Sequence, residues 1–489
     1  MEQSITYFTE KCIPRFENLQ EIFLKEPSKL NEFVRGIQES LNKLGNTIIR
    51  ETLEMMDEQL RASSKVHKGW RISTTATKQL ITSFGSMEYR KTYFKKVDEK
   101  YTVCLLDRVM KMPPDSRMTE DVVANILEEA VDTSYRRGGE AASDGTSVSK
   151  QTVKNILHNL EFPKYSYEGP RKVVDYLYID ADEDHTPLQF QKVKGDLEQN
   201  EYGRKNNCQI TKLIYVYEGV EPEAPKSKRN RLINPYYFCR VCEGQENEEL
   251  WKEVLEYIER TYDTSRIKKI YLNSDGGGWI KAGTKVIDKA VAVLDGFHIS
   301  EHLIAMTGHL YDSQDEAIRQ LRSCIRKKSK KEFDDVVEKV KLSITSEAKL
   351  KKIDEHARYI MNNWTAARAR LVAQDAVHGC SAEGHVSHVL ASRMSTLPMG
   401  WSKKGASQMA RLRAYKYNKG KMIDLVRYQN NEEVPLAAGA EKIILGAGRT
   451  KPLKESSEEM IEKYREAMSC HITDFGKKKA WFAQQIWGL

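Results

Sequence analysis

One short stretch has the spacing of a metallohydrolase motif. In LDGFHISEH, residues 294–302, the side chains His298, Glu301 and His302 spell H-x-x-E-H, the pattern of the inverzincins. On a helix the two histidines would lie one turn apart on the same face, where they could share a zinc ion. Because the motif is only five residues long, the rest of the chain must decide between zinc chemistry and another role.

A second group of chemically competent residues consists of acids at the ends of expected strands. Asp180 and Asp182 end the run YLYIDAD, on the same face of that strand. Asp275 ends the run YLNSD, and the glycines after it let a backbone or a phosphate come close. Glu383 begins an expected helix in SAEGHVSHVLASRM. Because sites in open α/β sheets form outside the carboxyl ends of strands, we expect these acids to converge.

Converging carboxylates suit phosphodiester cleavage and strand transfer. Both reactions require charge to be neutralised on the attacking and leaving oxygens, which two metal ions about 4 Å apart can supply. Hard divalent ions such as Mg²⁺ prefer oxygen ligands, so two Asp and one Glu suit them. The alternative is that each acid is an ordinary turn former or an exposed helix residue.

Other potential metal ligands are expected to have structural roles. Residues near Glu383 fit no compact zinc pattern and are expected to line or support the edge of the site: His378, Cys380, His385 and His388. Cys239 and Cys242 form a C-x-x-C within an expected strand, where packing is favoured over zinc. The other cysteines are scattered, which indicates free thiols in a reducing compartment.

The elements that must position the acids follow one another between residues 173 and 300. Strands are expected over 173–182, 208–219 and 233–244, then an amphipathic helix over 248–264, and further strands over 267–277 and 289–299. This is an α/β pattern around a mixed sheet, and its order matches a ribonuclease-H-like core. Residues 301–375 are charged and predicted to be helical throughout, as an insertion into that core.

The N-terminal part has a different character. Residues 1–62 show helical spacing, and residues 79–107 predict two or three strands. A helix-turn-helix-like unit follows, in which Asp144 and Gly145 supply the turn and Ser149 caps the second helix. Side chains at the start of that helix would point outward to the edges of a DNA groove: Lys150, Gln151, Thr152 and Lys154.

The charge distribution also favours a polyanionic partner. The net charge is +8, and residues 401–421 carry seven Lys or Arg and no acid. Aromatic residues interleave with these cations, a combination that suits phosphates and unstacked bases, so Lys416 and Lys419 are expected to contact DNA. A solvated basic face is the alternative. Trp279 and Trp401 are expected to pack rather than to stack on bases.

Four sequence blocks together resemble a known family. YLYIDADEDHTPLQ, SDGGGWIKAG, LDGFHISEHL and SAEGHVSHVLASRMSTLPMGWS are similar to the signature blocks of ISLre-type insertion-sequence transposases, relatives of the Mutator-like DDE transposases. The resemblance covers roughly residues 75–415. It implies a ribonuclease-H-like catalytic domain with an all-helical insertion before the last acid.

The resemblance assigns roles to individual residues. It implies a DDE triad of Asp182, Asp275 and Glu383 that binds Mg²⁺, or Mn²⁺ in its place, with Asp180 as the alternative first acid. Asp295 and His298 match the family's Asp/Cys-x-x-His element. The H-x-x-E-H pattern is then this element running into a helix, which leaves Glu301 and His302 without a required metal role.

The implied function is DNA transposition. Such a protein would bind the terminal inverted repeats of its element, cleave the ends, and join each 3′-OH to target DNA as a homodimer or higher oligomer. Two rivals remain: a zinc metallohydrolase, and a non-catalytic DNA-binding protein derived from a transposase. No apolar run approaches the roughly 18 residues of a membrane span and no secretory signal is evident, so a cytoplasmic, nucleoid-associated protein is expected.

The expected organisation has five parts. They are an N-terminal helical region (1–75), a strand region with the helix-turn-helix-like unit (76–165), a catalytic domain (172–300 and 376–415), the helical insertion (301–375) and a C-terminal basic, helical region (416–489).

Overall fold

The chain forms two compact units, unit 1 (Met1–Ile156 and Met422–Leu489) and unit 2 (Leu157–Lys421). The computed structural model describes residues 2–431 except for 98–100, 114–115, 190–197, 200–204, 207, 228, 243–245, 374–376 and 398. From residue 432 onward, the expected C-terminal region lies outside the described residues.

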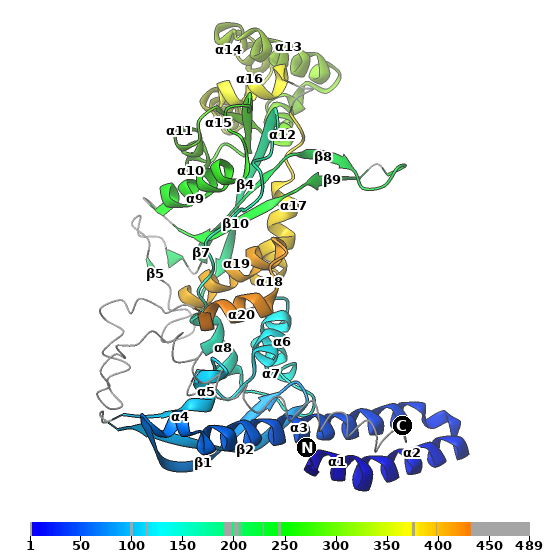
Figure 1. The fold of residues 1–489 in the computed structure, drawn as a ribbon. Coiled ribbons are helices and arrows are strands. Elements are labelled where there is room, and N and C mark those ends of the chain that lie inside the picture. The colour runs from blue at the N-terminus through cyan, green and yellow to red at the C-terminus, as the bar shows by residue number, and fades with distance from the viewer. Residues whose placement is uncertain are drawn as a thin grey trace. The chain divides into compact units, whose positions relative to one another are not determined.

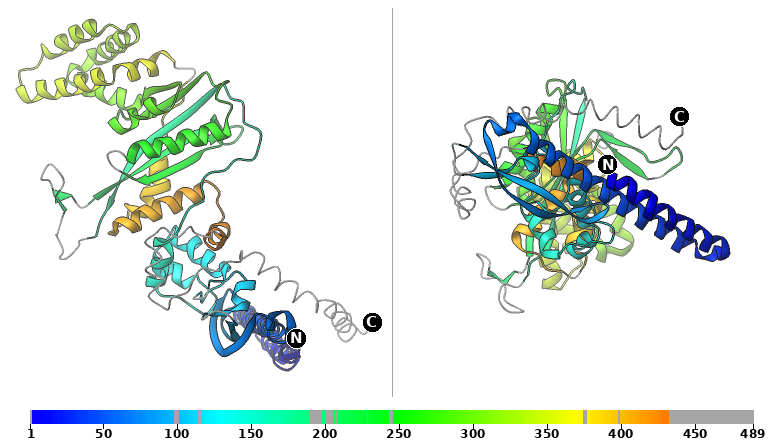
Figure 2. Two further views of the ribbon diagram at one scale, coloured as in Figure 1. Left: turned by 60° about the vertical axis from the view of Figure 1, so that its left-hand side comes forward. Right: turned by 60° about the horizontal axis from the view of Figure 1, so that its bottom comes forward.

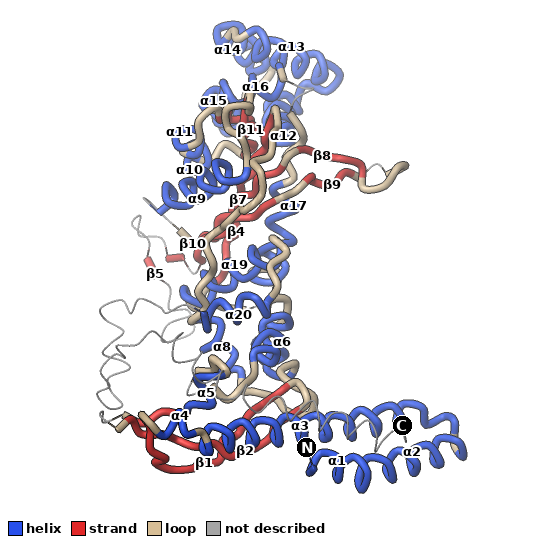
Figure 3. The backbone as a smooth tube through the Cα atoms, in the orientation of Figure 1, coloured by secondary structure: helices blue, strands red, loops and turns tan. Residues whose placement is uncertain are grey.

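Unit 1 combines a helical hairpin, an antiparallel sheet of three strands and a group of shorter helices (Figures 1 and 3). Its helices are α1 (Glu2–Tyr7), α2 (Ile13–Lys25), α3 (Leu30–Ala62), α4 (Ser64–His67), α5 (Leu105–Val109), α6 (Glu120–Ala130), α7 (Tyr135–Glu140) and α20 (Met422–Asn431), and α8 (Lys150–His158) crosses into unit 2. Its strands are β1 (Trp70–Thr82), β2 (Gly85–Lys96) and β3 (Thr102–Cys104).

The sheet of unit 1 packs on α3. Leu60 on the helix and Phe94 on β2 are fully buried in the shared core, and α2 lies along the other half of α3 (Figure 2). β1 begins at Trp70, although the sequence predicted strands only from residue 79. The added part, Arg71–Thr75, is exposed at every position, so it shows none of the apolar alternation that identifies a strand.

α7 and α8 are joined by the expected turn. Gly145 has a φ of 67°, which glycine adopts readily, and the hydroxyl of Ser149 accepts the backbone N–H of Thr152 at 3.1 Å, the predicted cap. Gly139 is required where α7 meets the turn, because a Cβ there would lie 2.2 Å from the carbonyl oxygen of Val148.

Unit 2 is built around a mixed sheet of five strands. The strands are β4 (Tyr176–Pro187), β7 (Cys208–Tyr217), β10 (Tyr236–Val241), β11 (Lys269–Ser274) and β12 (Ala290–Leu294), and the order across the sheet is β10-β7-β4-β11-β12. β7 runs antiparallel to both of its neighbours, β10 and β4, whereas β11 and β12 run parallel to β4. The fold is therefore mixed α/β, with the strands near their predicted positions. One correction concerns β4, which continues to Pro187, so Asp180 and Asp182 lie within this strand and not at its end.

Helices cover both faces of this sheet (Figure 1). Alternate residues of β4, such as Ile179 and Ala181, pack with Trp251 of α9 (Glu246–Thr261). The other face, which includes Asp180, is covered by the segment that contains α17 (Ala382–Val386), a π-helical turn (Ser387–Ala391), α18 (Ser392–Met394) and α19 (Lys403–Tyr417). Short helices α10 (Gly278–Lys281) and α11 (Gly283–Val286) follow β11.

A helical insertion separates β12 from α17. It consists of α12 (Gly296–Thr307), a 3₁₀ turn (Gly308–Ser313), α13 (Gln314–Lys327), α14 (Lys330–Lys341), α15 (Glu347–Asn362) and α16 (Trp364–Val372). Its core also includes Leu294 of β12, and Leu321, Phe333 and Ile360 are fully buried in it. α12 begins at Gly296, a few residues before the expected start of the insertion.

Several details differ from the sequence-based expectation. A hairpin of β8 (Gly219–Pro222) and β9 (Asn230–Ile233), and the short pair β5 (Glu198–Gln199) and β6 (Lys205–Asn206), were not predicted. The basic run 401–421 is mostly the helix α19, which continues past the expected boundary at 415/416 and packs on β10. Within the described ranges, no helix combines the length and apolar character that a membrane crossing requires.

Candidate active site

Asp182 lies on β4 opposite Leu213 and is half-buried. It is on the same face of the sheet as Asp180, the face that the segment with α17 and α19 covers. Burial raises the pKa of Asp182 to about 6, and the negative charges of Asp275, Glu183 and Glu383 add to this rise. The backbone N–H of Glu183 donates to the carboxylate of Asp182 at 2.8 Å, and this hydrogen bond acts to lower the pKa of Asp182. Three of the predicted acids, from distant parts of the sequence, therefore share one electrostatic environment.

Asp275 follows β11 in a loop that the insertion holds in place. The hydroxyl of Tyr359, on α15, donates to the carbonyl oxygen of Asp275. Gly276 has a φ of 96°, and a Cβ there would lie 2.6 Å from the side-chain oxygen of Asn363. Only glycine fits this turn without strain. The carboxylate itself is exposed and accepts the N–H of Gly277 at 2.9 Å.

Glu383 is an exposed residue in the first turn of α17, and the chain just before it is anchored to the sheet. The backbone N–H of Ser381 donates to the carboxylate of Asp180 at 3.0 Å. The hydroxyls of Ser381 and Tyr215 are 2.8 Å apart. These contacts bring the helix that carries Glu383 to the strand that carries Asp182.

Asp180 has a different environment from Asp182, although both lie on the same strand face. It is fully buried, and its carboxylate accepts hydrogen bonds from three side chains besides Ser381: Tyr215 (2.8 Å), Tyr217 (3.1 Å) and Asn273 (2.7 Å). A carboxylate with this many donors has little capacity left for a metal ion. Of the two alternatives for the first acid, the geometry favours Asp182 as the metal ligand and Asp180 as its support.

The donor chemistry of the three acids fits a hard divalent cation, since every side-chain donor is an oxygen. Burial is the main cause of the raised pKa of Asp182, and the repulsion from neighbouring carboxylates that adds to it is the kind that a bound cation would relieve. As placed, no three His, Cys, Asp or Glu side chains in the described part of the chain converge on one ion. Asp275 and Glu383 are exposed, so their side chains can change rotamer readily.

The residues of the H-x-x-E-H pattern lie on α12 beside α15. The ring of His302 stacks on that of Tyr359 at a centroid distance of 3.7 Å, and its Nδ1 is 2.8 Å from Nδ1 of His356. His298 faces Glu301, with 3.4 Å between Nδ1 and Oε2. His302 therefore links two helices of the insertion, through a tyrosine that also contacts the Asp275 loop.

Asp295 stands where β12 ends and α12 begins. Its backbone N–H donates to the carbonyl oxygen of Ser274 at 2.9 Å, which ties the ends of β11 and β12 together next to Asp275. Burial and the charges of Asp275, Asp295 and Glu301 raise the pKa of Tyr359 to about 12. Asp295 and Asp275 thus lie near the same tyrosine.

The histidines around Glu383 hold their segment against aromatic side chains of the sheet. His378 packs on Tyr178 at a ring distance of 4.5 Å, and His385 packs on Tyr215 at the same distance. Burial lowers the pKa of both histidines. Burial also raises the pKa of the Cys380 thiol, which disfavours the thiolate that would bind a soft metal.

The expected DNA-contacting residues differ in exposure. Lys150, Gln151 and Lys154 are exposed at the start of α8, whereas Thr152 is half-buried. In the basic run, Lys419 is exposed and Lys416 is half-buried. Arg413 of that run is buried, and it donates to the carbonyl oxygens of residues 388 and 389.

Other side chains singled out in the sequence lie in cores. Trp401 is buried, with its indole N–H donating to the carbonyl oxygen of Met394 at 2.9 Å. Trp279 is half-buried and packs against the core beneath the sheet. Cys239 and Cys242 are both buried, and burial raises the pKa of each thiol.

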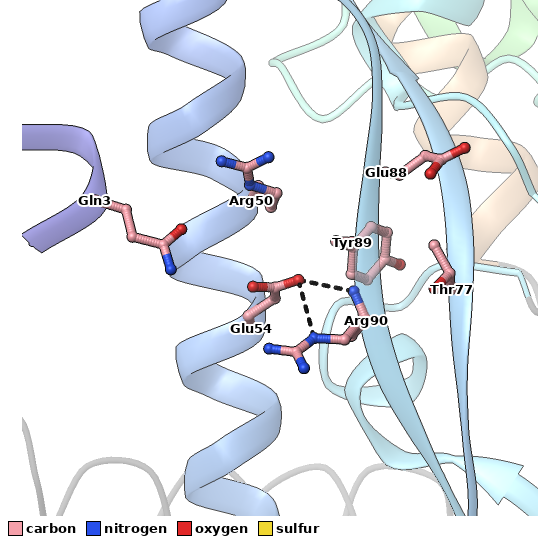
Figure 4. A pocket seen from close by; sticks show the side chains of 7 residues that line it. All are labelled: Gln3, Arg50, Glu54, Thr77, Glu88, Tyr89 and Arg90. Carbon is pink, nitrogen blue, oxygen red and sulfur yellow. Dashed lines mark hydrogen bonds and ion pairs between the residues drawn. The ribbon is translucent and has the colours of Figure 1, made fainter. Parts of the chain in front are cut away.

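A polar depression of about 380 Å³ lies in unit 1 between α3 and the β1–β2 hairpin (Figure 4). Its walls carry charges of both signs, including Arg50, Glu54 and Arg90, and Glu54 accepts the backbone N–H of Arg90 at 3.0 Å. None of the residues singled out in the sequence lines it.

Sequence reasoning missed the hydrogen-bond donors that support the acids. Ser381 begins one of the quoted sequence blocks but was assigned no role there, and the other donors belong to no motif: Tyr215, Tyr217, Asn273 and Tyr359. The one usable signal was a polar Asn273 inside an otherwise apolar strand, because a buried polar side chain needs a partner.

Comparisons with known proteins find relatives without a described activity. Residues 23–432 match the model of the "Uncharacterised protein family (UPF0236)". Two relatives from Caldanaerobacter subterraneus subsp. tengcongensis, UPF0236 protein TTE2489 and UPF0236 protein TTE0402, are each 33% identical over 443 residues. The alignments cover 90% of this chain and 88% and 83% of the respective relatives.

A third relative from the same organism, also 33% identical over 90% of this chain and 88% of its own length, has a name that joins eleven locus designations. Among solved structures, the "Drosophila P element transposase strand transfer complex" aligns with 76% of this chain and 82% of that chain, at 10% identity and a TM-score of 0.23. A TM-score this low carries no argument about fold or function.

Proposed function

This chain belongs to the UPF0236 family, and we propose that it is an ISLre-type DDE transposase, which cleaves DNA at the ends of its own element and joins them to target DNA. The observation that carries the proposal is the placement of the acids on neighbouring elements. Asp182 lies on β4, and Asp275 follows β11, the parallel neighbour of β4. The segment that leads into Glu383 is hydrogen-bonded to β4 at Asp180. The charges of Asp275 and Glu383 add to the rise that burial causes in the pKa of Asp182, as expected where carboxylates approach one another at a functional site.

The sheet supports a ribonuclease-H-like core as the scaffold. Three consecutive antiparallel strands are followed by two strands parallel to the first, in the order β10-β7-β4-β11-β12. Asp182 lies on the central strand β4, and Asp275 follows its parallel neighbour β11. The last acid comes after the helical insertion, as the resemblance to the transposases implies.

The chemistry proposed for the site follows from its carboxylates. Asp182, Asp275 and Glu383 would hold Mg²⁺, which when bound neutralises charge on the attacking and leaving oxygens of the scissile phosphate. With a pKa of about 6, Asp182 is mostly ionised at pH 7.5 and able to act as a ligand. Asp180 fixes the distance between β4 and α17, and Tyr359 fixes the Asp275 loop.

The names of relatives add independent support. One relative carries eleven locus designations from a single organism. A gene that copies itself into new sites would leave the same sequence at many loci. We infer that this family spreads within genomes, as a transposase gene would.

End recognition is assigned to the N-terminal region. The start of α8 presents exposed Lys150, Gln151 and Lys154, side chains that suit phosphate and base-edge contacts. The helix is short and capped at Ser149, so these side chains have a defined direction.

The direct test uses purified protein and DNA that contains its gene with both flanks. With Mg²⁺, we expect cleavage at the element ends, and we expect Glu383→Gln to abolish it. Glu347→Gln is the matched control, because Glu347 is also an exposed glutamate in the first turn of a helix. Cleavage that survives Glu383→Gln, or that is lost with zinc-selective chelators while Mg²⁺ is present, would contradict the proposal.

A further inference from the structure

A dense group of cations lies where α13 turns into α14. Within six residues, five exposed basic side chains follow one another, and we call this group the basic corner: Arg326, Lys327, Lys328, Lys330 and Lys331. Arg368, on α16, lies beside it, with its Nε donating to the carbonyl oxygen of Arg326 at 3.3 Å. Three helices of the insertion therefore contribute positive charge to one place.

The cations of the basic corner have no carboxylate partner in the part of the chain that the structure describes. Glu332, Asp334 and Asp335 follow on α14, but no ion pair joins them or any other described acid to the five basic side chains. Elsewhere on the same helices such pairs do form, as between Arg319 and Glu316 at 2.8 Å. Among the described residues, the positive charge of the corner is thus not neutralised by any ion pair.

Three of these lysines stand where their charge or shape is locally unfavourable. Lys328 has a φ of 63° at the end of α13, a left-handed position that favours glycine. Lys330 and Lys331 lie in the first turn of α14, where the helix dipole disfavours cations. The ammonium of Lys330 also lies over the ring of Trp364, 5.8 Å from its centroid, a contact that offsets part of this cost. For Lys328 and Lys331 no such contact is seen among the described residues, and local rules broken without a structural gain indicate a functional role.

The backbone of the corner is well fixed. The N–H of Ser329 donates to the carbonyl oxygen of Cys324 at 3.0 Å, and its hydroxyl accepts the N–H of Glu332 at 3.3 Å. Phe333 is fully buried against Trp364, at a ring distance of 5.3 Å. The lysines are therefore presented from a rigid turn, which lowers the entropic cost of binding.

We propose that the basic corner binds the phosphate backbone of duplex DNA without reading its sequence. The inference rests on the proposed function only in taking DNA as the polyanion. Backbone contacts position a protein on DNA and carry no sequence information, so the corner suits flanking or target DNA better than the element ends. An anionic membrane is less well matched, because the neighbouring apolar residues Ile325 and Phe333 are buried and cannot insert into lipid.

The test measures binding of the full-length protein to a duplex of unrelated sequence, in EDTA, over a range of salt concentrations. The variant Arg326→Gln/Lys327→Gln/Lys331→Gln removes three charges from the corner. If each makes one phosphate contact, the slope of log K against log salt should fall by about 2.7, with a loss of affinity of up to about 100-fold at 0.15 M salt.

The matched control removes three charges from another exposed part of the insertion, through Lys349→Gln, Lys351→Gln and Lys352→Gln on α15. We expect this control to change affinity by less than about threefold, as a general charge effect would. Equal losses in the two triple variants, or no loss in the corner variant, would overturn the proposal. So would a corner variant that loses binding to phosphatidylglycerol vesicles but keeps duplex binding.

A single substitution separates binding from folding. Lys328→Gly removes one charge and supplies the residue that the left-handed position favours. It should weaken duplex binding about fivefold while the melting temperature stays the same or rises. Unchanged binding would overturn the proposal, and intact end cleavage in that case would leave the proposed function standing.

Discussion

Two aspartates that stand two residues apart on β4 should respond oppositely to the same substitution. For Asp182→Asn we expect unit 2 to become more stable in the absence of metal. The pKa of Asp182 rises from 3.8 to about 6, and each unit corresponds to about 1.4 kcal/mol. The upper limit for the gain in unfolding free energy is about 3 kcal/mol. Because the side chain is only half-buried, solvent screening should reduce this gain to about 1–2 kcal/mol.

Asp180→Asn should have the opposite effect. The carboxylate of Asp180 is fully buried and accepts hydrogen bonds from Tyr215, Tyr217, Asn273 and Ser381. An asparagine amide keeps one acceptor oxygen and turns a donor group toward other donors. Leaving one or two buried donors without a partner, at about 1–3 kcal/mol each, should destabilise unit 2 by about 2–5 kcal/mol.

The assay is urea unfolding at pH 7.5 with EDTA, followed by tryptophan fluorescence. Four of the seven tryptophans lie in unit 2, so changes in unit 2 contribute to the signal: Trp251, Trp279, Trp364 and Trp401. Asp288→Asn is the control. Asp288 is exposed and forms no ion pair with a described residue, so its loss should change the unfolding free energy by less than about 0.5 kcal/mol.

The effect of pH gives a further check on Asp182. Because its pKa is raised in the folded state, the stabilisation linked to its proton is present below about pH 3.8 and is lost as the pH rises through about 6. The asparagine side chain introduced by Asp182→Asn does not titrate, so the advantage of the variant should be absent near pH 4 and complete at pH 7.5. A destabilised Asp182→Asn variant at pH 7.5, or a neutral Asp180→Asn, would refute the assignment of the two roles.

Three further predictions follow from individual contacts. His302→Ala should lower the unfolding free energy by about 1–2 kcal/mol, because it removes the ring stacked on Tyr359 at 3.7 Å. Urea unfolding measures this loss, and an unchanged midpoint would contradict the prediction. Gly276→Ala should reduce both stability and end cleavage, because this position has a φ of 96° and an added Cβ would clash there. Gly278→Ala should be neutral in both assays, because a Cβ at that position meets nothing within 4 Å. Gln151→Ala should weaken binding to end DNA relative to random DNA by about 1–3 kcal/mol in a competition assay, and unchanged discrimination would exclude α8 from recognition.

Much of the sheet could be predicted from the sequence. Runs rich in Val, Ile and Tyr identified β4, β7, β10, β11 and β12, since buried strands consist of such residues. The β8–β9 hairpin was missed because its strands are short and partly charged, and because only Gly219 among their residues is buried. Periodicity detects burial, and a hairpin of this kind has little of it.

Asp275 follows the end of a strand, as predicted, but Asp180 and Asp182 lie within β4, which continues to Pro187 instead of ending at Asp182. The separate roles of these acids could not be predicted. Asp180 and Asp182 share a strand face, and strand alternation treats them alike. What separates them is the set of donors around Asp180, which come from β7, β11 and the segment before α17. The link from Tyr359 to the Asp275 loop was equally hidden, because it depends on how the insertion packs.

The central claim is that Asp182, Asp275 and Glu383 act as one DNA-cleaving site. The most direct measurement is the single-turnover rate of Mg²⁺-dependent end cleavage by Asp275→Asn, by Glu383→Gln and by the double variant. Residues that act as a unit are not additive, so the double variant should be no slower than either single variant, and all three should be lower than the unaltered protein by several orders of magnitude. Losses that multiply in the double variant, or a single variant that cleaves near the unaltered rate, would contradict the account.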